Sequence, residues 1–311
     1  MDRHRLFDYA GLLLTATALL ADGVLAAGFA PRHLLLAGTA AAFGVTTTAE
    51  LRGLRRTEAL PLDRGDAADA LAVVAGAGLT YWFSVDAGLG PVLASASVGL
   101  AAGVAVPRVD SAAYCGSFVG MVSPAVFPEL SLVLVAGVAS AGLFVAARGA
   151  FDGYGGKLGT TALFGCLVAA AASGTAFAAG SSPAWGETVF VVPTAVIAAA
   201  LTVVLGVRYG LGAVVASAVV GLLAGVGLPA LFPELGGTLA LAAFCASFVG
   251  MVAPARIDGE LRVGLTGAVS GLAFVALSPA LAGAGGKLGT TAFVSCLAAV
   301  GVAEGVERLD R

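Results

Sequence analysis

The chain has 311 residues, of which 59% are apolar and only 11% are charged. Soluble globular proteins carry about a quarter charged residues, so this composition excludes an ordinary soluble domain and indicates an integral membrane protein. The net charge of −3 is spread thinly, and no basic stripe with interleaved aromatic residues points to nucleic acid. The expected partners are therefore the lipid bilayer and a small molecule or ion, with no nucleic acid and no cofactor.

Apolar runs predict twelve transmembrane helices, since a helix needs about 20 mostly apolar residues to cross a bilayer. The runs begin near Phe7, Arg32, Ala67, Gly88, Ser111, Leu130, Lys157, Val189, Gly210, Gly237, Val263 and Lys287. The first run shares features with a cleaved signal peptide, but we expect it to be retained as the first helix. The predicted fold is an all-α integral membrane protein with about 12 transmembrane helices.

Two motifs recur exactly 130 residues apart, which indicates a duplication. AAYCGSFVGMVSPA at 112–125 matches AAFCASFVGMVAPA at 242–255 in eleven of fourteen positions, and GGKLGTT begins at both Gly155 and Gly285. Upstream, VDAGLGPVLASASVGLAAG and VRYGLGAVVASAVVGLLAG match with an offset of 122. Each copy therefore contains five predicted helices.

The predicted organisation has three parts: an accessory two-helix segment at 1–56, repeat A at 67–178 and repeat B at 187–305. Because five is an odd number, repeat B must enter the membrane from the opposite side, and the two repeats are predicted to be inverted. The positive-inside rule tests this arrangement. With both termini cytoplasmic, fourteen of the sixteen basic residues lie inside, and only Arg32 and Lys287 lie outside.

If the SFVGM segments instead dipped into the membrane and returned, eleven basic residues would lie inside and five outside. The charge distribution therefore favours full crossing. We expect a multi-pass protein of the cell (inner) membrane with both termini in the cytoplasm; a homo-oligomer is compatible with these features.

Lys157 and Lys287 are the only lysines, beside fourteen arginines. Each follows a glycine pair that opens the backbone at a predicted helix start, where free N–H groups and the helix dipole favour an anion. Spacings of three and four residues place two threonines on the face of each lysine. The predicted solute-binding residues at these starts are Gly155, Gly156, Lys157, Thr160, Thr161, Gly285, Gly286, Lys287, Thr290 and Thr291. The alternative is that each lysine only extends to the lipid headgroups.

The SFVGM motif places Ser117, Gly120, Met121 and Pro124 on one stripe of a predicted helix. We expect Ser117 and its counterpart Ser247 to add hydroxyl groups to the same solute pathway; a close-packed interface of small residues is the alternative. A metal site is not expected, because Cys115 and Met121 point to different faces of a helix.

These features predict a membrane transporter or channel for a small solute, with an anion favoured and the site at the interface of the two repeats. A carrier of a neutral solute or cation with structural lysines is the main alternative. An intramembrane hydrolase with a serine–lysine pair and a structural membrane protein are less favoured. No acidic residue or histidine lies in the middle of a predicted helix, so neither proton coupling nor catalysis is supported.

Overall fold

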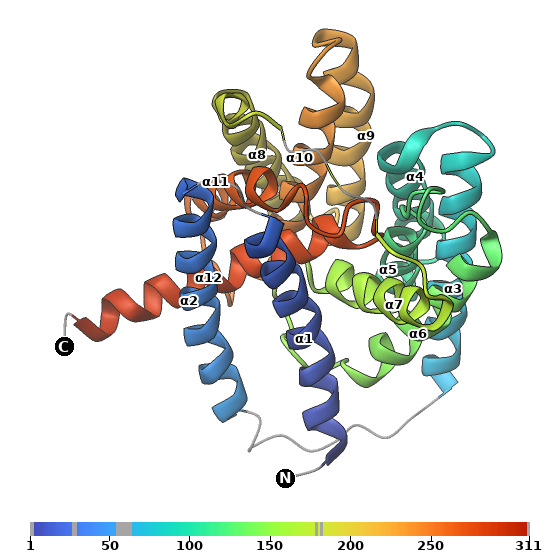
Figure 1. Ribbon diagram of the computed structural model, residues 1–311, viewed down its shortest axis with the longest axis horizontal. Helices are drawn as coiled ribbons and strands as arrows, with labels where there is room; N and C mark the ends of the chain where they lie inside the picture. The colour runs from blue at the N-terminus through green and yellow to red at the C-terminus, as the bar shows by residue number, and fades with distance from the viewer. Residues whose placement is uncertain (1–2, 27–29, 54–63, 178–179, 181–182, 310–311) are drawn as a thin grey trace.

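A computed structural model describes residues 3–26, 30–53, 64–177, 180 and 183–309. These residues form twelve α-helices and no β-strand (Figure 1). Each helix begins within four residues of a predicted start, so the prediction of an all-helical fold is confirmed for the described residues. The linker between the second and third helices, 54–63, lies outside the described residues.

The helices have the following bounds: α1 Arg3–Ala26, α2 Ala30–Gly53, α3 Arg64–Val85, α4 Gly90–Ala105, α5 Asp110–Val119, α6 Leu130–Ala146, α7 Lys157–Ser173, α8 Thr188–Val203, α9 Ala213–Leu231, α10 Gly236–Val249, α11 Glu260–Leu277 and α12 Lys287–Leu309. A 3-10 turn, Trp185–Glu187, precedes α8, and a π-helical turn, Val204–Arg208, extends it.

Several helices have the length and apolar composition of membrane-spanning segments. Five described segments meet both criteria: Gly65–Val85, Trp185–Arg208, Ala213–Leu231, Glu260–Leu277 and Lys287–Val306. Helices α4, α6, α7 and α10 are shorter, with 14 to 17 residues, and α5 has only ten residues. Ten residues rise about 15 Å, about half of the hydrocarbon core of a bilayer. The fold is therefore of a membrane type, with five spans evident from length and composition.

The SFVGM motif was predicted to place Ser117, Gly120, Met121 and Pro124 on one stripe of a helix. This prediction is wrong for Met121 and Pro124. Helix α5 ends at Val119 and α10 ends at Val249, so Met121 and Pro124 lie outside the helix. Proline disfavours helical geometry in the residue before it. In addition, Gly120 packs closely against α3, at the point where the chain leaves helix α5.

In the first half of the chain, α3 packs against α5 and α6 through small residues. Any Cβ atom at Gly116 or Gly120 would overlap the backbone of α3. The Tyr81 hydroxyl donates a hydrogen bond of 2.6 Å to the carbonyl of Phe127. At the other end of α3, Asp66 forms a salt bridge with Arg148. These contacts fix α5 and α6 along α3.

The second half repeats this arrangement around α8, which packs against α10 and α11. A Cβ atom at Gly250 would overlap Ala199 and Thr202 of α8. Arg208 and Glu260 form a salt bridge of 3.7 Å between the end of α8 and the start of α11. The sequence match is therefore accompanied by a match of neighbours in space.

The two halves meet through helices that correspond in the sequence repeat. Helix α4 packs against α9, with Gly103 beside Val215 and Gly225 beside Leu93. Positions 103 and 225 match in the repeat, as do 93 and 215, so the two contacts are reciprocal. The pairing also shows that α4 and α9 run in opposite directions.

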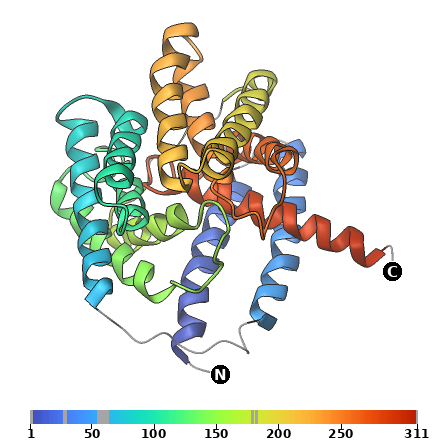
Figure 2. The ribbon, with the colours of Figure 1, turned by 180° about the vertical axis from the view of Figure 1, so that it is seen from behind.

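Helices α7 and α12 form the second contact between the halves, and they cross near their starts. A Cβ atom at Gly159 would overlap the backbone of Gly289, and one at Gly289 would approach Gly159 equally closely. From this crossing, the two helices extend to opposite sides of the molecule (Figures 1 and 2). Helix α12 runs crosswise to α1 and α2 in both views.

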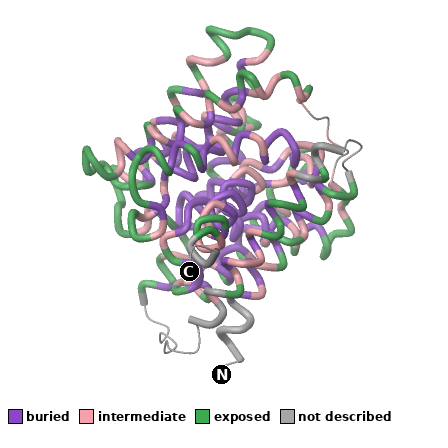
Figure 3. Tube along the Cα trace, turned by 90° about the vertical axis from the view of Figure 1, so that its left-hand side faces the viewer, coloured by how far each residue is buried: buried purple, intermediate pink, exposed green. Residues whose placement is uncertain are grey.

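Buried residues gather in the centre of the molecule (Figure 3). Four aromatic side chains, Tyr114, Phe118, Phe244 and Phe248, form a cluster between the halves. The ring centroids of Tyr114 and Phe118 lie 4.4 Å apart, and those of Phe118 and Phe248 lie 4.6 Å apart. Phe118 and Phe248 lie near the ends of α5 and α10, against the glycine pairs that precede α12 and α7.

Candidate functional site at the crossing of α7 and α12

The local structure requires glycine at each position of the glycine pairs that begin the two GGKLGTT motifs. Gly156 and Gly286 precede their helices with φ angles of 82° and 80°, a left-handed conformation that other residues rarely adopt. Gly155 lies against the carbonyl oxygen of Phe248, and any Cβ atom there would overlap it. Gly285 lies in the same way against the end of α5. Protein atoms from the other half therefore occupy the space beside these glycines.

Both lysines bind the carbonyl groups that follow the preceding helix. The Nζ atom of Lys157 donates a 3.1 Å hydrogen bond to the Arg148 carbonyl, and Lys287 donates one of 2.5 Å to the Ser278 carbonyl. A cation is favoured there by the negative end of the helix dipole. Each ammonium group has three N–H donors, and within the described residues only one is used. The lysines are half-buried and retain donors for a ligand.

The predicted threonines are buried, and their hydroxyl protons stay within their own helices. Thr160 donates to the carbonyl of Gly156, and Thr161 donates to that of Lys157, at 3.3 and 3.1 Å. Thr290 and Thr291 repeat both bonds at 3.1 Å. The hydroxyl groups can therefore present only lone pairs to a solute.

Ser117 and Ser247 lie deep between helices. The Ser117 hydroxyl lies 2.8 Å from that of Ser95, and the Ser247 hydroxyl lies 2.8 Å from that of Ser217. The Tyr114 hydroxyl extends the second pair, at 3.0 Å from Ser217. All four serines are fully buried, so these bonds tie α4 to α5 and α9 to α10.

The four cysteines surround the same helix starts as free thiols. The thiol of Cys115 donates to the Leu158 carbonyl at 3.3 Å, and that of Cys245 donates to the Leu288 carbonyl at 3.1 Å. Cys166 and Cys296 pack beside the glycine pair of the opposite motif. Among the described residues, no group of three or more cysteine, histidine or acidic side chains could hold a metal ion.

A cavity of about 590 Å³ lies at the start of α12 and receives residues from both halves of the chain. Its wall includes Lys287 and the first turn of α12, together with Phe118 and Ser123 from the first half. The first helical N–H groups have no partner within a helix. This cavity therefore combines a cation, free backbone donors and aromatic rings, although Glu187 and Glu234 also line it.

The Lys157 end differs from the Lys287 end because larger side chains fill matching positions. Tyr154 occupies the position of Ala284, which lines the cavity, and Arg256 occupies the position of Val126. Tyr154 is only 6% exposed and packs near Phe293, with 6.4 Å between the ring centroids. Leu163 takes the place of Phe293 at the other end.

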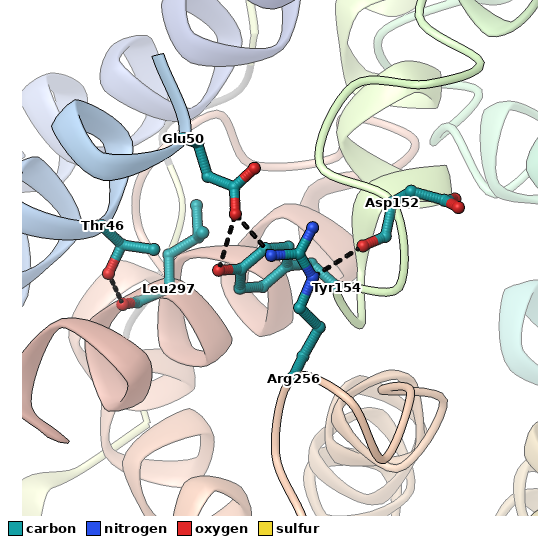
Figure 4. A network of polar contacts seen from close by, with 6 residues as sticks. All are labelled: Thr46, Glu50, Asp152, Tyr154, Arg256 and Leu297. Atoms are coloured by element: carbon teal, nitrogen blue, oxygen red, sulfur yellow. Dashed lines mark hydrogen bonds and ion pairs between the residues drawn. The ribbon is translucent and has the colours of Figure 1, made fainter. Parts of the chain in front are cut away.

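A polar network holds Tyr154 in place (Figure 4). The guanidinium carbon of Arg256 lies 4.5 Å from the centroid of the tyrosine ring. The Oε1 atom of Glu50 accepts hydrogen bonds of 2.5 Å from Arg256 and 3.3 Å from the Tyr154 hydroxyl. Arg256 also donates to the Asp152 carbonyl at 2.9 Å. Glu50 belongs to α2, so this helix contributes directly to the Lys157 end.

This network was not predicted, although the sequence contains a signal for it. The segments that precede the two lysine motifs differ in aromatic content: FDGYGGK has Phe151 and Tyr154, whereas LAGAGGK has Leu281 and Ala284. Differences in the residues that directly precede two identical motifs mark the positions at which the two ends of the site differ.

Comparison with protein-family models, curated proteins and solved structures gives no match. The fold and the geometry of the site therefore carry the functional argument.

Proposed function

We propose that this protein moves a small solute, with an anion favoured, across the membrane through the cavity at Lys287. The observation that carries the proposal is the cavity itself, which receives residues from both halves and ends at the first turn of α12. Its volume lies within the range of about 300–1,000 Å³ that is typical of small-molecule sites.

An anion in this cavity would meet three kinds of favourable group. The Lys287 ammonium group supplies charge and N–H donors beyond its bond to Ser278. The first turn of α12 supplies backbone N–H groups and the positive end of a dipole. The Phe118 and Phe248 rings form an apolar wall that lowers the local dielectric constant and strengthens these interactions. The buried threonines would support the helix start and would not donate to the anion.

A cation is the second candidate solute, and two observations favour it. Glu187 and Glu234 line the cavity against a single lysine, and Lys287 already binds the carbonyl of Ser278. In that case, the lysines would serve as structural caps of the preceding helices.

We also propose that the two halves are inverted repeats and that the chain changes sides of the membrane twelve times, with the short helix α5 covering only part of its crossing and the starts of α7 and α12 meeting inside the membrane. The opposite directions of α4 and α9 and the reciprocal contacts at Gly159 and Gly289 support this arrangement. The polar contacts between connecting segments support it as well, because twelve alternating crossings place both partners of each contact on one side. On the cytoplasmic side these are Arg148 with Asp66, Arg208 with Glu260, and Arg256 with Glu50; on the outer side, Leu281 with Asp22 and Ser123 with Gly283.

Flux into proteoliposomes tests the proposal. We expect the purified protein to admit at least one anion from a panel of halides, nitrate, phosphate and acetate faster than protein-free vesicles do. Potassium, sodium and glycerol serve as the comparison solutes. Flux of a cation alone would support the second candidate, and flux of none of these solutes by folded protein would contradict transport through this cavity.

A further inference from the structure

We infer that the groove between α2, α11 and α12 binds an anionic phospholipid from the surrounding bilayer. This groove has a volume of about 820 Å³ and is separate from the cavity at Lys287. The inference does not depend on which solute is transported, because no lining residue is shared between the two spaces.

The body of the groove is apolar and matches an acyl chain. Its walls come from three helices and consist mainly of aliphatic side chains and small residues, among them Leu35, Gly38, Ala42, Leu265, Val269 and Val302. Leu265 and Val302 are 60% and 58% exposed. Large exposed apolar side chains of this kind are favourable in contact with lipid and costly in contact with water.

The charged residues of the lining, Arg256, Arg262 and Glu304, gather at one end of the groove. Arg256 precedes α11, and Arg262 lies in its first turn. Glu50, near the end of α2, forms a salt bridge with Arg256. This part of α2 therefore lies at the same end of the groove as Arg256. Leu35 lies fifteen residues earlier on α2, which corresponds to about 22 Å of helix. The groove thus has a polar head and an apolar body, as a phospholipid does.

Arg262 is the residue assigned to the lipid phosphate. Arg256 is already engaged by Glu50 and Tyr154, and Glu304 adds a carboxylate to the lining. Arg262 is exposed at the mouth, and a guanidinium group can bind a phosphate through two parallel hydrogen bonds. Both arginines also lie on the predicted cytoplasmic side, where basic pockets between membrane helices bind anionic headgroups.

Lipid retention by the full chain tests the inference. The protein is purified in detergent, exchanged into micelles that contain equal amounts of phosphatidylglycerol and phosphatidylcholine, and analysed by native mass spectrometry. Arg262→Ala removes the proposed phosphate ligand, and Arg108→Ala removes an exposed arginine from another loop as the matched control. Gly38→Phe fills the groove, because no atom lies within 4 Å of a Cβ atom at this position. Gly44→Phe, on the same helix and equally unobstructed, is its control.

We expect wild type and both controls to retain phosphatidylglycerol in preference to phosphatidylcholine. Arg262→Ala should lower the retained phosphatidylglycerol about fivefold, and Gly38→Phe should lower it further without lowering the melting temperature below that of Gly44→Phe. Equal retention of the two lipids by wild type would overturn the inference. Unchanged retention in Arg262→Ala, or displacement of the lipid by millimolar inorganic phosphate alone, would overturn it as well.

Discussion

Replacing Ala284 with tyrosine is expected to abolish solute flux through the protein. Ala284 lines the cavity beside Lys287, and the matching position at the other end holds Tyr154, whose ring fills that space. A tyrosine at 284 would therefore occupy the volume that the solute needs. Initial flux rates in proteoliposomes provide the measurement, with a fall to the rate of protein-free vesicles expected.

The reverse substitution at the matching position, Tyr154→Ala, is the second variant in this experiment. Tyr154→Ala should open the Lys157 end and raise the flux severalfold, because it removes the ring that Arg256 and Glu50 hold. Tyr154→Phe keeps the ring and loses only the hydroxyl bond, so its flux should stay close to that of wild type. Wild-type flux in Ala284→Tyr would show that the solute does not use this cavity.

Gly159→Val is expected to destabilise the protein more than any surface change. A Cβ atom at Gly159 would overlap the backbone of Gly289 at the crossing of α7 and α12, where neither backbone can yield independently. Overpacking of this kind typically costs about 1–3 kcal/mol, and a clash with backbone belongs at or above the upper end. Thermal unfolding in detergent should show a clearly lower melting temperature.

Gly142→Val is the control for that substitution. Gly142 lies on an exposed face of α6 with no atom within 4 Å of a Cβ atom. Valine is also the better helix former of the two residues, so this variant should melt at or slightly above the wild-type temperature. Equal melting temperatures for the two variants would contradict the close crossing of α7 and α12.

Much of the fold could be predicted from the sequence, because apolar runs indicate the helices and glycine-rich breaks indicate where they begin or end. The two copies of GGKLGTT lie where α7 and α12 cross, with Gly159 and Gly289 in reciprocal contact. The end of α5 could not be placed, because SFVGM continues an apolar helical pattern. Its end at Val119 depends on a tertiary contact between Gly120 and α3.

The candidate site was only partly predictable for a similar reason. Spacing placed Thr160 near Lys157, but it did not show that the threonine hydroxyl would donate to its own helix. The role of Glu50 was also hidden, since its partners Tyr154 and Arg256 lie 104 and 206 residues away in the sequence. Such long-range contacts depend on how α2 packs against α12, which helical periodicity alone does not specify.

The central claim, an anion pathway that runs from the cavity at Lys287 to the Lys157 end, is tested most directly by anion flux in Lys287→Ala and Lys157→Ala proteoliposomes. Lys287→Gln is the decisive companion, because it removes the charge and keeps an N–H donor at the end of a side chain that is one atom shorter. We expect flux to be lost in all three variants and reduced but present in Lys287→Arg. Wild-type anion flux in folded Lys287→Gln and Lys157→Ala would contradict the claim and identify the lysines as structural caps.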